Sequence, residues 1–172
     1  ANGALSGGGE EYKIRRKLIE NHLVEAILVL PRNLFYTTDI SVTLWIVNKN
    51  KKAQTKQIGD EIRQYRDREN EILFMDLRQM GEPFEKKYTQ FSETDIQKIA
   101  GTYHAWQSVQ TRHVETRHAT SLREQEYANI PEYCYSATMD EIAKKDFSLV
   151  PSKYIEFVNR DENIDFDEKM QT

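Results

Sequence analysis

The clearest pattern of hydrophobic and polar positions in the chain covers residues 10–49. Ile14, Leu18 and Ile19 are spaced about one helical turn apart, and this apolar stripe predicts an amphipathic helix. Residues 7–9 are three glycines just before the stripe, where a chain can turn sharply. The simplest interpretation of the glycines is a flexible turn into the helix, and a phosphate-binding or cofactor-binding turn is the alternative.

Two apolar runs follow this helix. Residues 23–30 carry one charge, Glu25, and such a run is typical of a strand that is covered on both faces and parallel to its neighbours. Pro31 ends the run, because proline cannot donate to a sheet ladder. Residues 42–47 form the second run. About ten residues separate the two runs, too few for a helical crossover, so the second strand is expected to return antiparallel.

Beyond these runs, hydrophobic periodicity and helix-capping residues predict further ordered elements. Ser92 can cap a helix with Asp95 three residues on, and Thr138 and Glu141 form a capping-box pair for another helix. The predicted elements are a strand over residues 72–77, a turn at 81–83, a helix over 92–106, a short strand at 133–135, a helix over 139–145 and an extended segment at 148–151.

Other segments lack such signals. Residues 50–60 are polar and predict a solvated loop, and the alternating charges of residues 62–70 predict an exposed segment. Residues 107–125 have no clear period and are interpreted as loop or irregular helix. The acidic residues 160–172 are expected to fray. Residues 1–5 are apolar and could be the tail of a strand.

Composition narrows the class of protein. The chain has 172 residues, 38% hydrophobic and 30% charged, which is enough for one domain with a real core. No apolar run approaches the roughly 20 residues of a membrane span, so no membrane association is expected, and no signal peptide is visible. The single cysteine, Cys134, excludes an internal disulfide and a thiolate metal cluster. A cytoplasmic location is therefore expected.

Charge is unevenly distributed along the chain. Residues 1–70 carry 12 basic and 9 acidic side chains, whereas residues 71–172 carry 12 basic and 19 acidic ones. A net charge of −4 is unusual for a free-standing DNA binder, whose affinity comes mainly from neutralising phosphates. If the chain contacts DNA, the first half is the expected side.

Four segments carry a resemblance to a known family. They are Gly-Ala-Leu-Ser-Gly-Gly-Gly-Glu-Glu at residues 3–11, Ile-Arg-Arg-Lys-Leu-Ile-Glu at 14–20, Leu-Pro-Arg-Asn-Leu-Phe-Tyr-Thr-Thr at 30–38 and Ile-Val-Asn-Lys at 46–49. The chain resembles the modification (methyltransferase) subunit of type I restriction–modification systems. Such subunits transfer a methyl group from S-adenosylmethionine to the exocyclic amino group of adenine in DNA, beside separate specificity and restriction subunits.

The resemblance covers residues 1–52 strongly and is weaker at residues 72–78, 91–100 and 140–154. It matches only the C-terminal half of the family. It implies an α/β fold, the C-terminal portion of a Rossmann-like S-adenosylmethionine-dependent methyltransferase. Its sheet would be incomplete, with a terminal antiparallel strand and C-terminal helices.

The implied domain organisation has three parts. Residues 1–80 would be the C-terminal half of the methyltransferase domain, residues 81–160 a helical C-terminal extension and residues 161–172 a flexible tail. The strand at residues 23–30 would also pair with a strand that ends near residues 1–5. Without that upstream sheet its open edge should recruit a second chain as a homodimer, or residues 1–5 should fold back over it.

Two motifs that the family's chemistry needs are absent. Adenine methyltransferases grip the base with a Pro-Pro-aromatic turn, but the four prolines, Pro31, Pro83, Pro131 and Pro151, are never adjacent. No Gly-x-Gly turn follows a complete strand with an acidic residue for the ribose after it. We therefore expect no catalytic and no cofactor-binding residue in this chain, which alone would be inactive. A stand-alone, non-catalytic scaffold module of a restriction–modification complex is the alternative.

The loop over residues 30–38 holds the candidates for contact with DNA, namely Arg32, Asn33, Phe35 and Tyr36. Enzymes that modify a base pull it out of the stack and hold it against an aromatic face, which Phe35 or Tyr36 could supply. Arg32 could contact a phosphate. The alternative, favoured for Phe35, is that Leu34 and Phe35 only pack the strand turn.

A metal centre and a reactive thiol are not expected. His104, His113 and His118 fall close together, but their spacings do not repeat an i, i+4 pair, so they are interpreted as solvated side chains. Cys134 lies in Tyr-Cys-Tyr and has no nearby histidine in sequence, which indicates a buried, inert thiol.

Overall fold

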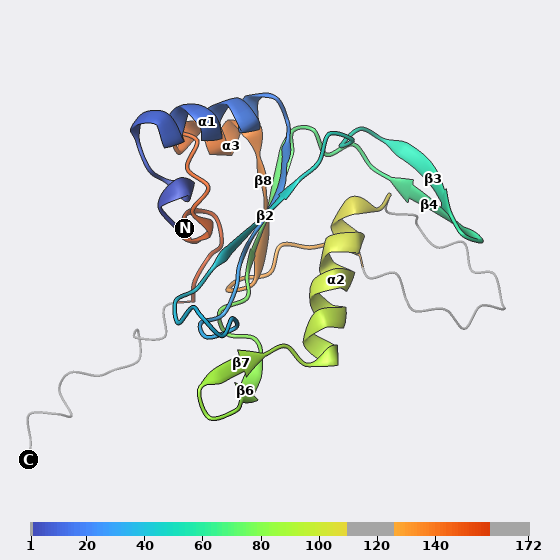
Figure 1. Cartoon of the computed structure of the whole chain (residues 1–172). Helices are drawn as coiled ribbons and strands as arrows, with labels where there is room; N and C mark the ends of the chain where they lie inside the picture. Colours follow the sequence, from blue (N-terminus) through green and yellow to red (C-terminus); the bar gives the residue numbers. More distant parts are fainter. Residues whose placement is uncertain (1, 110–125, 159–172) are drawn as a thin grey trace, which may run out of the picture.

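The computed structural model describes residues 2–109 and 126–158 of the chain (Figure 1). Its centre is a mixed four-stranded sheet with the strand order β2-β1-β5-β8, where β1 and β5 are parallel and the outer strands antiparallel. The strands are β1 (Val24–Val29), β2 (Thr43–Val47), β5 (Glu71–Asp76) and β8 (Cys134–Thr138). This confirms a mixed α/β fold, and it confirms the antiparallel return of the second predicted strand.

Helices cover both faces of this sheet (Figure 1). On one face, Ile19 of α1 (Gly9–Glu20) and Ile142 of α3 (Met139–Lys144) pack against Ile27 and Phe74. On the other face, Trp106 of α2 (Glu93–Gln107) belongs to a second apolar cluster. Because β1 and β5 have apolar neighbours on both faces, their sequences are almost continuously hydrophobic.

The predicted helix starts are confirmed for two helices. Ser92 accepts a hydrogen bond from the Asp95 backbone and Thr138 accepts one from Glu141, and in each case the acidic side chain accepts one in return. These are capping boxes at the starts of α2 and α3. α1 begins after Gly8, which has no side chain to cap it.

The expected strand tail at the start of the chain is wrong, because Asn2–Leu5 form a 3-10 helix, η1. Leu5 is 3% exposed and lies in the same core cluster as Val24 and Ile27. The predicted open edge at residues 23–30 is wrong too, because β1 is paired on both sides, by β2 and β5. The physical reason given for a homodimer through that edge therefore disappears.

Two hairpins replace segments that were predicted to be irregular. Residues 50–60 were expected to form a solvated loop, but β3 (Gln54–Ile58) and β4 (Glu61–Tyr65) pair as an antiparallel hairpin. Its side chains are mostly exposed on both faces, so no alternating apolar pattern marks it. Gly59, at φ +62°, forms the tight turn with Asp60.

The second hairpin replaces the turn expected at residues 81–83. β6 (Glu82–Phe84) and β7 (Tyr88–Gln90) pair with each other outside the central sheet. In Figure 1 it lies near the end of the sheet opposite β3 and β4.

The segment expected to be a helical extension also contributes to the sheet. β8 pairs with β5 along its length, from Glu71 opposite Thr138 to Met75 opposite Cys134. It is longer than the strand predicted at residues 133–135. Residues 148–150 are followed by a second 3-10 helix, η2 (Pro151–Lys153), that begins at the proline. The predictions for residues 110–125 and 160–172 lie outside the described residues.

Candidate functional site

The carboxyl ends of the parallel strands β1 and β5 point to the same edge of the sheet. In open α/β sheets this edge is where ligands bind. The loop after β1 covers residues 30–42, and the β6–β7 hairpin follows β5 a few residues later. The two segments join where the Thr89 N–H donates to the Asn33 carbonyl at 3.0 Å.

Backbone contacts fix the loop after β1. The Leu30 N–H donates to the Val42 carbonyl at 2.8 Å and closes the loop at its base. Arg32 Nε donates to the Asp39 carbonyl at 3.1 Å, across the loop. Asn33 has a left-handed backbone, φ +58°, which asparagine tolerates better than most residues. The loop therefore presents its middle residues in one defined arrangement.

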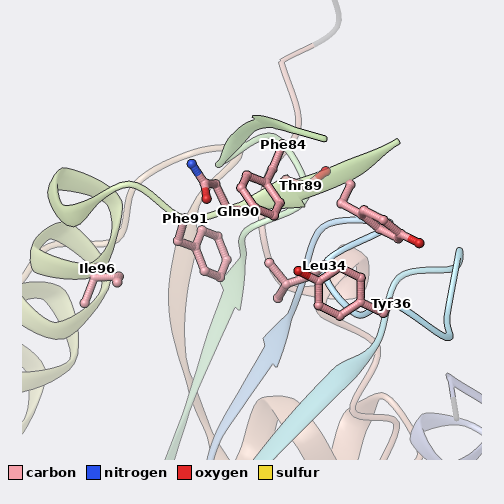
Figure 2. A pocket seen from close by; sticks show the side chains of 8 residues that line it. Leu34, Tyr36, Phe84, Thr89, Gln90, Phe91 and Ile96 are labelled. Carbon is pink, nitrogen blue, oxygen red and sulfur yellow. The ribbon is translucent and has the colours of Figure 1, made fainter. Parts of the chain in front are cut away.

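A pocket of about 360 Å³ lies between this loop and the β6–β7 hairpin. Figure 2 shows Leu34 and Tyr36 on one side of it, with Phe84 and Phe91 across from them. Thr89, Gln90, Tyr88 and Ile96 complete the lining. Aromatic and aliphatic side chains share the lining with the polar groups of Tyr36, Tyr88, Thr89 and Gln90, so the pocket suits a flat ligand with polar edges.

Tyr36 is the loop residue whose aromatic ring lines this pocket. Its side chain is 66% exposed, and its ring meets that of Tyr88 edge to face, with centroids 4.7 Å apart and an interplanar angle of 76°. Tyr36 and Tyr88 also line an adjoining hollow of about 300 Å³. One aromatic face is thus available beside two adjacent cavities.

Phe35 lies in the adjoining hollow rather than in the aromatic pocket, together with Asn33, Asp39 and Lys87. It is 46% exposed, so the interpretation that Phe35 only packs the strand turn is wrong. Leu34 does pack against the second core cluster. Leu34 is thus the half-buried side chain at this part of the loop, and Phe35, Tyr36 and Thr37 after it are exposed.

The hairpin half of the pocket is not among the residues predicted from the sequence. Phe84, Tyr88 and Phe91 were not singled out, although three aromatic residues within eight positions of a polar stretch are an available signal. Their meaning depends on the contact between β7 and the loop after β1, which sequence spacing does not give.

A buried polar network lies near the opposite ends of the same strands. Glu25 is 1% exposed and sits where a bulge in β1 leaves it without a partner on β2. Its carboxylate accepts hydrogen bonds from Arg68 at 3.0 Å, Gln107 at 3.1 Å and Asn48 at 2.5 Å. The carboxylate is well supplied with donors and lines neither pocket, so we assign it a structural role.

Lys51 and Arg66 extend this network. Lys51 Nζ donates to the Val24 and Glu71 carbonyls, both at 2.8 Å, and burial lowers the pKa of Lys51 to about 8. Arg66 binds the Glu71 carboxylate through two nitrogens, at 2.9 and 2.8 Å. Burial would raise the pKa of Glu71, but hydrogen bonds from Arg66 and Ser136 outweigh it and lower that pKa.

The described residues hold no group of three or more His, Cys, Asp and Glu side chains placed to bind a metal ion. His104 is an exposed residue of α2, and His113 and His118 lie outside the described residues. Cys134 is buried, as predicted, and burial raises the pKa of its thiol. Across residues 2–109 and 126–158, no helix has both the length and the apolar character that a membrane span requires.

Comparisons with known proteins agree on one family. The family model described as N-6 DNA Methylase matches residues 1–163. The chain is 34% identical over 173 residues to the "Type I restriction enzyme HindI methylase subunit" of Haemophilus influenzae, which spans 99% of this chain and 32% of that protein. It is 29% identical to the "Type I restriction enzyme MjaIX methylase subunit" of Methanocaldococcus jannaschii, over 99% of this chain and 26% of that protein.

A solved structure has the same fold. The type I restriction-modification system methyltransferase subunit from Streptococcus thermophilus aligns with a TM-score of 0.63 at 22% identity, covering 90% of this chain and 25% of that chain. The chain therefore spans about a third or less of the length of these proteins.

Proposed function

The chain belongs to the N-6 DNA methylase family, and from this premise we propose that it is part of a type I modification subunit. The whole protein would transfer a methyl group from S-adenosylmethionine to the amino group of adenine in DNA. Its partners would be DNA and the specificity and restriction subunits of the complex, in the cytoplasm. In this proposal residues 1–80 belong to the C-terminal half of a Rossmann-like catalytic domain. Residues 81–160 extend it, and residues 161–172 form a tail.

The aromatic pocket at the carboxyl edge of β1 and β5 carries the proposal. A base that is stacked inside a duplex cannot reach a methyl donor. An enzyme that modifies the base must therefore flip it out of the helix and hold it against an aromatic face. Tyr36 offers a largely exposed ring beside this pocket, on the edge of the sheet where ligands bind. We assign Tyr36 the stacking contact with the flipped adenine.

The neighbouring residues have supporting roles in this proposal. Arg32 lies on the exposed side of the loop and would contact a phosphate next to the flipped nucleotide. Phe35 borders the adjoining hollow, where it would contact the sugar or a neighbouring base. Asn33 shapes the loop through its left-handed backbone.

These residues would contribute to the reaction by positioning the base. S-adenosylmethionine, when bound, would supply an electrophilic methyl group with its thioether as the leaving group, so adenine could accept the methyl group without a metal ion or a nucleophile from the enzyme. Rate enhancement then comes mainly from holding base and methyl donor in line. The chain has no Gly-x-Gly turn after a strand and no Pro-Pro-aromatic turn, so the cofactor and the adenine amine would be gripped elsewhere in the whole protein.

Paired alanine variants in the whole methyltransferase test this assignment. Tyr36→Ala should lower the rate of tritiated methyl transfer at least about tenfold, since a misplaced reacting group typically loses that much or more. Binding of S-adenosylmethionine should be unchanged, because Tyr36 holds the base. Phe35→Ala is the matched control and should lower the rate of methyl transfer clearly less. Equal, small effects of both changes would mean that the loop does not hold the base.

A further inference from the structure

The β6–β7 hairpin cannot be stable alone, because each strand has three residues and isolated two-stranded hairpins are marginal in water. It is held by the bond between Thr89 and Asn33, and by α2, whose capping residue Ser92 follows β7 closely. At its base Gly81 has φ +92°, and a Cβ there would lie 2.7 Å from a Thr89 side-chain carbon. The hairpin is therefore tightly packed at its base, around Gly81.

Two residues with a left-handed backbone form the tight turn at the tip of the hairpin. Glu85 and Lys86 both have left-handed backbones, φ +46° and +57°, without being glycine. Such conformations cost energy and persist where surrounding contacts enforce them. Here the tight turn brings the chain back so that Tyr88 stands opposite Phe84 and reaches Tyr36.

Tyr36 needs such a contact if it is to hold a base. A side chain that is 66% exposed has little packing to select one rotamer. Edge-to-face contact with a second aromatic ring supplies a directional preference. The contact between Tyr36 and Tyr88, with centroids 4.7 Å apart, joins the loop after β1 to β7 through side chains as well as backbone.

We infer that Tyr88 is a positioning residue for the methyl transfer: it holds the Tyr36 ring in the orientation against which the flipped adenine stacks. This inference rests on the proposed function of Tyr36. Tyr88 acts through Tyr36, because its ring meets the Tyr36 ring edge to face. The hairpin is then the second wall of the base-holding site.

A mutant cycle in the whole methyltransferase tests the inference. Tyr88→Ala should lower kcat about tenfold while the KM for DNA changes much less, since a group that only orients a bound base acts after binding. Tyr88→Phe should restore most of the lost rate, because the ring remains. The double variant Tyr36→Ala/Tyr88→Ala should be no slower than Tyr36→Ala alone, since the two rings work as one unit.

The matched control is Tyr12→Ala on α1, which removes another edge-to-face pair, that of Tyr12 and Phe147. It should leave kcat unchanged. Additive losses in the double variant, or a Tyr88→Ala enzyme with normal kcat, would overturn the inference. An unmutated protein that does not methylate adenine would instead reject the proposed function. Circular dichroism of each variant separates lost positioning from lost folding.

Discussion

Glu25 places a carboxylate inside the sheet, and the side chains around it explain how the fold tolerates the charge. Arg68 is its ionic partner, and both side chains are 1% exposed. Gln107 and Asn48 donate to the same carboxylate. A buried pair of this kind adds little net stability relative to apolar packing, but removing one partner leaves an uncompensated charge.

We therefore predict that Arg68→Met destabilises the chain by about 3–5 kcal/mol, the usual cost of breaking a buried ion pair. Urea unfolding followed by circular dichroism measures it. The matched control is Arg63→Met in the β3–β4 hairpin, which removes the exposed pair of Arg63 and Glu61. That variant should unfold at the wild-type midpoint. If both variants behave alike, Glu25 is not a buried, paired carboxylate.

Lys51 gives a second residue-scale prediction, on pH. Burial lowers its pKa from the ordinary 10.5 to about 8, and the attraction of Glu25 only partly offsets this. Between these two pH values the unfolded chain binds more protons than the folded chain, so the free energy of unfolding rises with pH through this window. Below pH 8 the cost of burying the charged ammonium is fully present.

The measurement compares wild type and Lys51→Met by urea unfolding from pH 7 to 10. The stability of wild type relative to the variant should increase across that range. Subtracting the free energy of unfolding of the variant from that of wild type removes the contribution of the tyrosines. Burial raises the pKa values of Tyr103, Tyr127 and Tyr154, so both proteins lose stability as these tyrosines begin to ionise. A difference that is flat or falls with pH would contradict a depressed Lys51 pKa.

At the scale of elements, α2 links the two ends of the sheet. Its first turn follows β7 beside the candidate pocket, and its last turn supplies Trp106 to the core and Gln107 to the Glu25 network. Trp106 Nε1 also donates to Ser136 of β8 at 2.8 Å. A change at the start of α2 is therefore expected to affect both the candidate pocket and the core.

The capping box provides the element-scale prediction. Ser92→Ala removes the side-chain acceptor for the Asp95 N–H and should cost about 1 kcal/mol, the typical loss at an N-cap. The lower thermal unfolding midpoint should be accompanied by faster hydrogen exchange at the start of α2. Thr94→Ala, in the same turn and exposed, is the control and should change little. Equal effects would show that the cap does not stabilise the helix.

At the scale of the whole molecule, the pocket is built by two segments that meet only in the folded chain. The loop after β1 supplies Leu34 and Tyr36, and the hairpin after β5 supplies Phe84 and Tyr88. Neither segment is part of the central sheet, but the parallel pairing of β1 and β5 directs both to one edge.

We predict that the isolated chain does not bind S-adenosylmethionine measurably. The reason is the missing glycine turn and ribose acid, which form the usual nucleotide-binding fingerprint. Isothermal titration calorimetry of the purified chain tests it, with the whole methyltransferase as the positive control. One-to-one binding at micromolar concentration by the chain alone would reject it and would direct attention back to residues 7–9.

Local signals were enough to predict several elements of this protein. Apolar runs predicted β1 and β5, because a strand that is buried on both faces must be apolar throughout. An apolar run also predicted β2, although this edge strand is partly exposed. Ser92 with Asp95 and Thr138 with Glu141 gave the starts of α2 and α3, because capping is decided within four residues. The resemblance of residues 1–52 identified the family. The role of the loop with Tyr36 stays a prediction.

The tertiary structure decided which segments meet. Residues 1–5 looked like a strand tail, but β5 takes the place beside β1, and Leu5 packs in the core instead. The β3–β4 hairpin is mostly exposed on both faces, so no alternation of apolar and polar residues marked it. Tyr88 joins the candidate pocket because the fold brings β7 against the loop that carries Tyr36. The packing of Leu5 and the contact between Tyr36 and Tyr88 depend on partners that are distant in sequence, and hydrophobic periodicity carries no information about such partners.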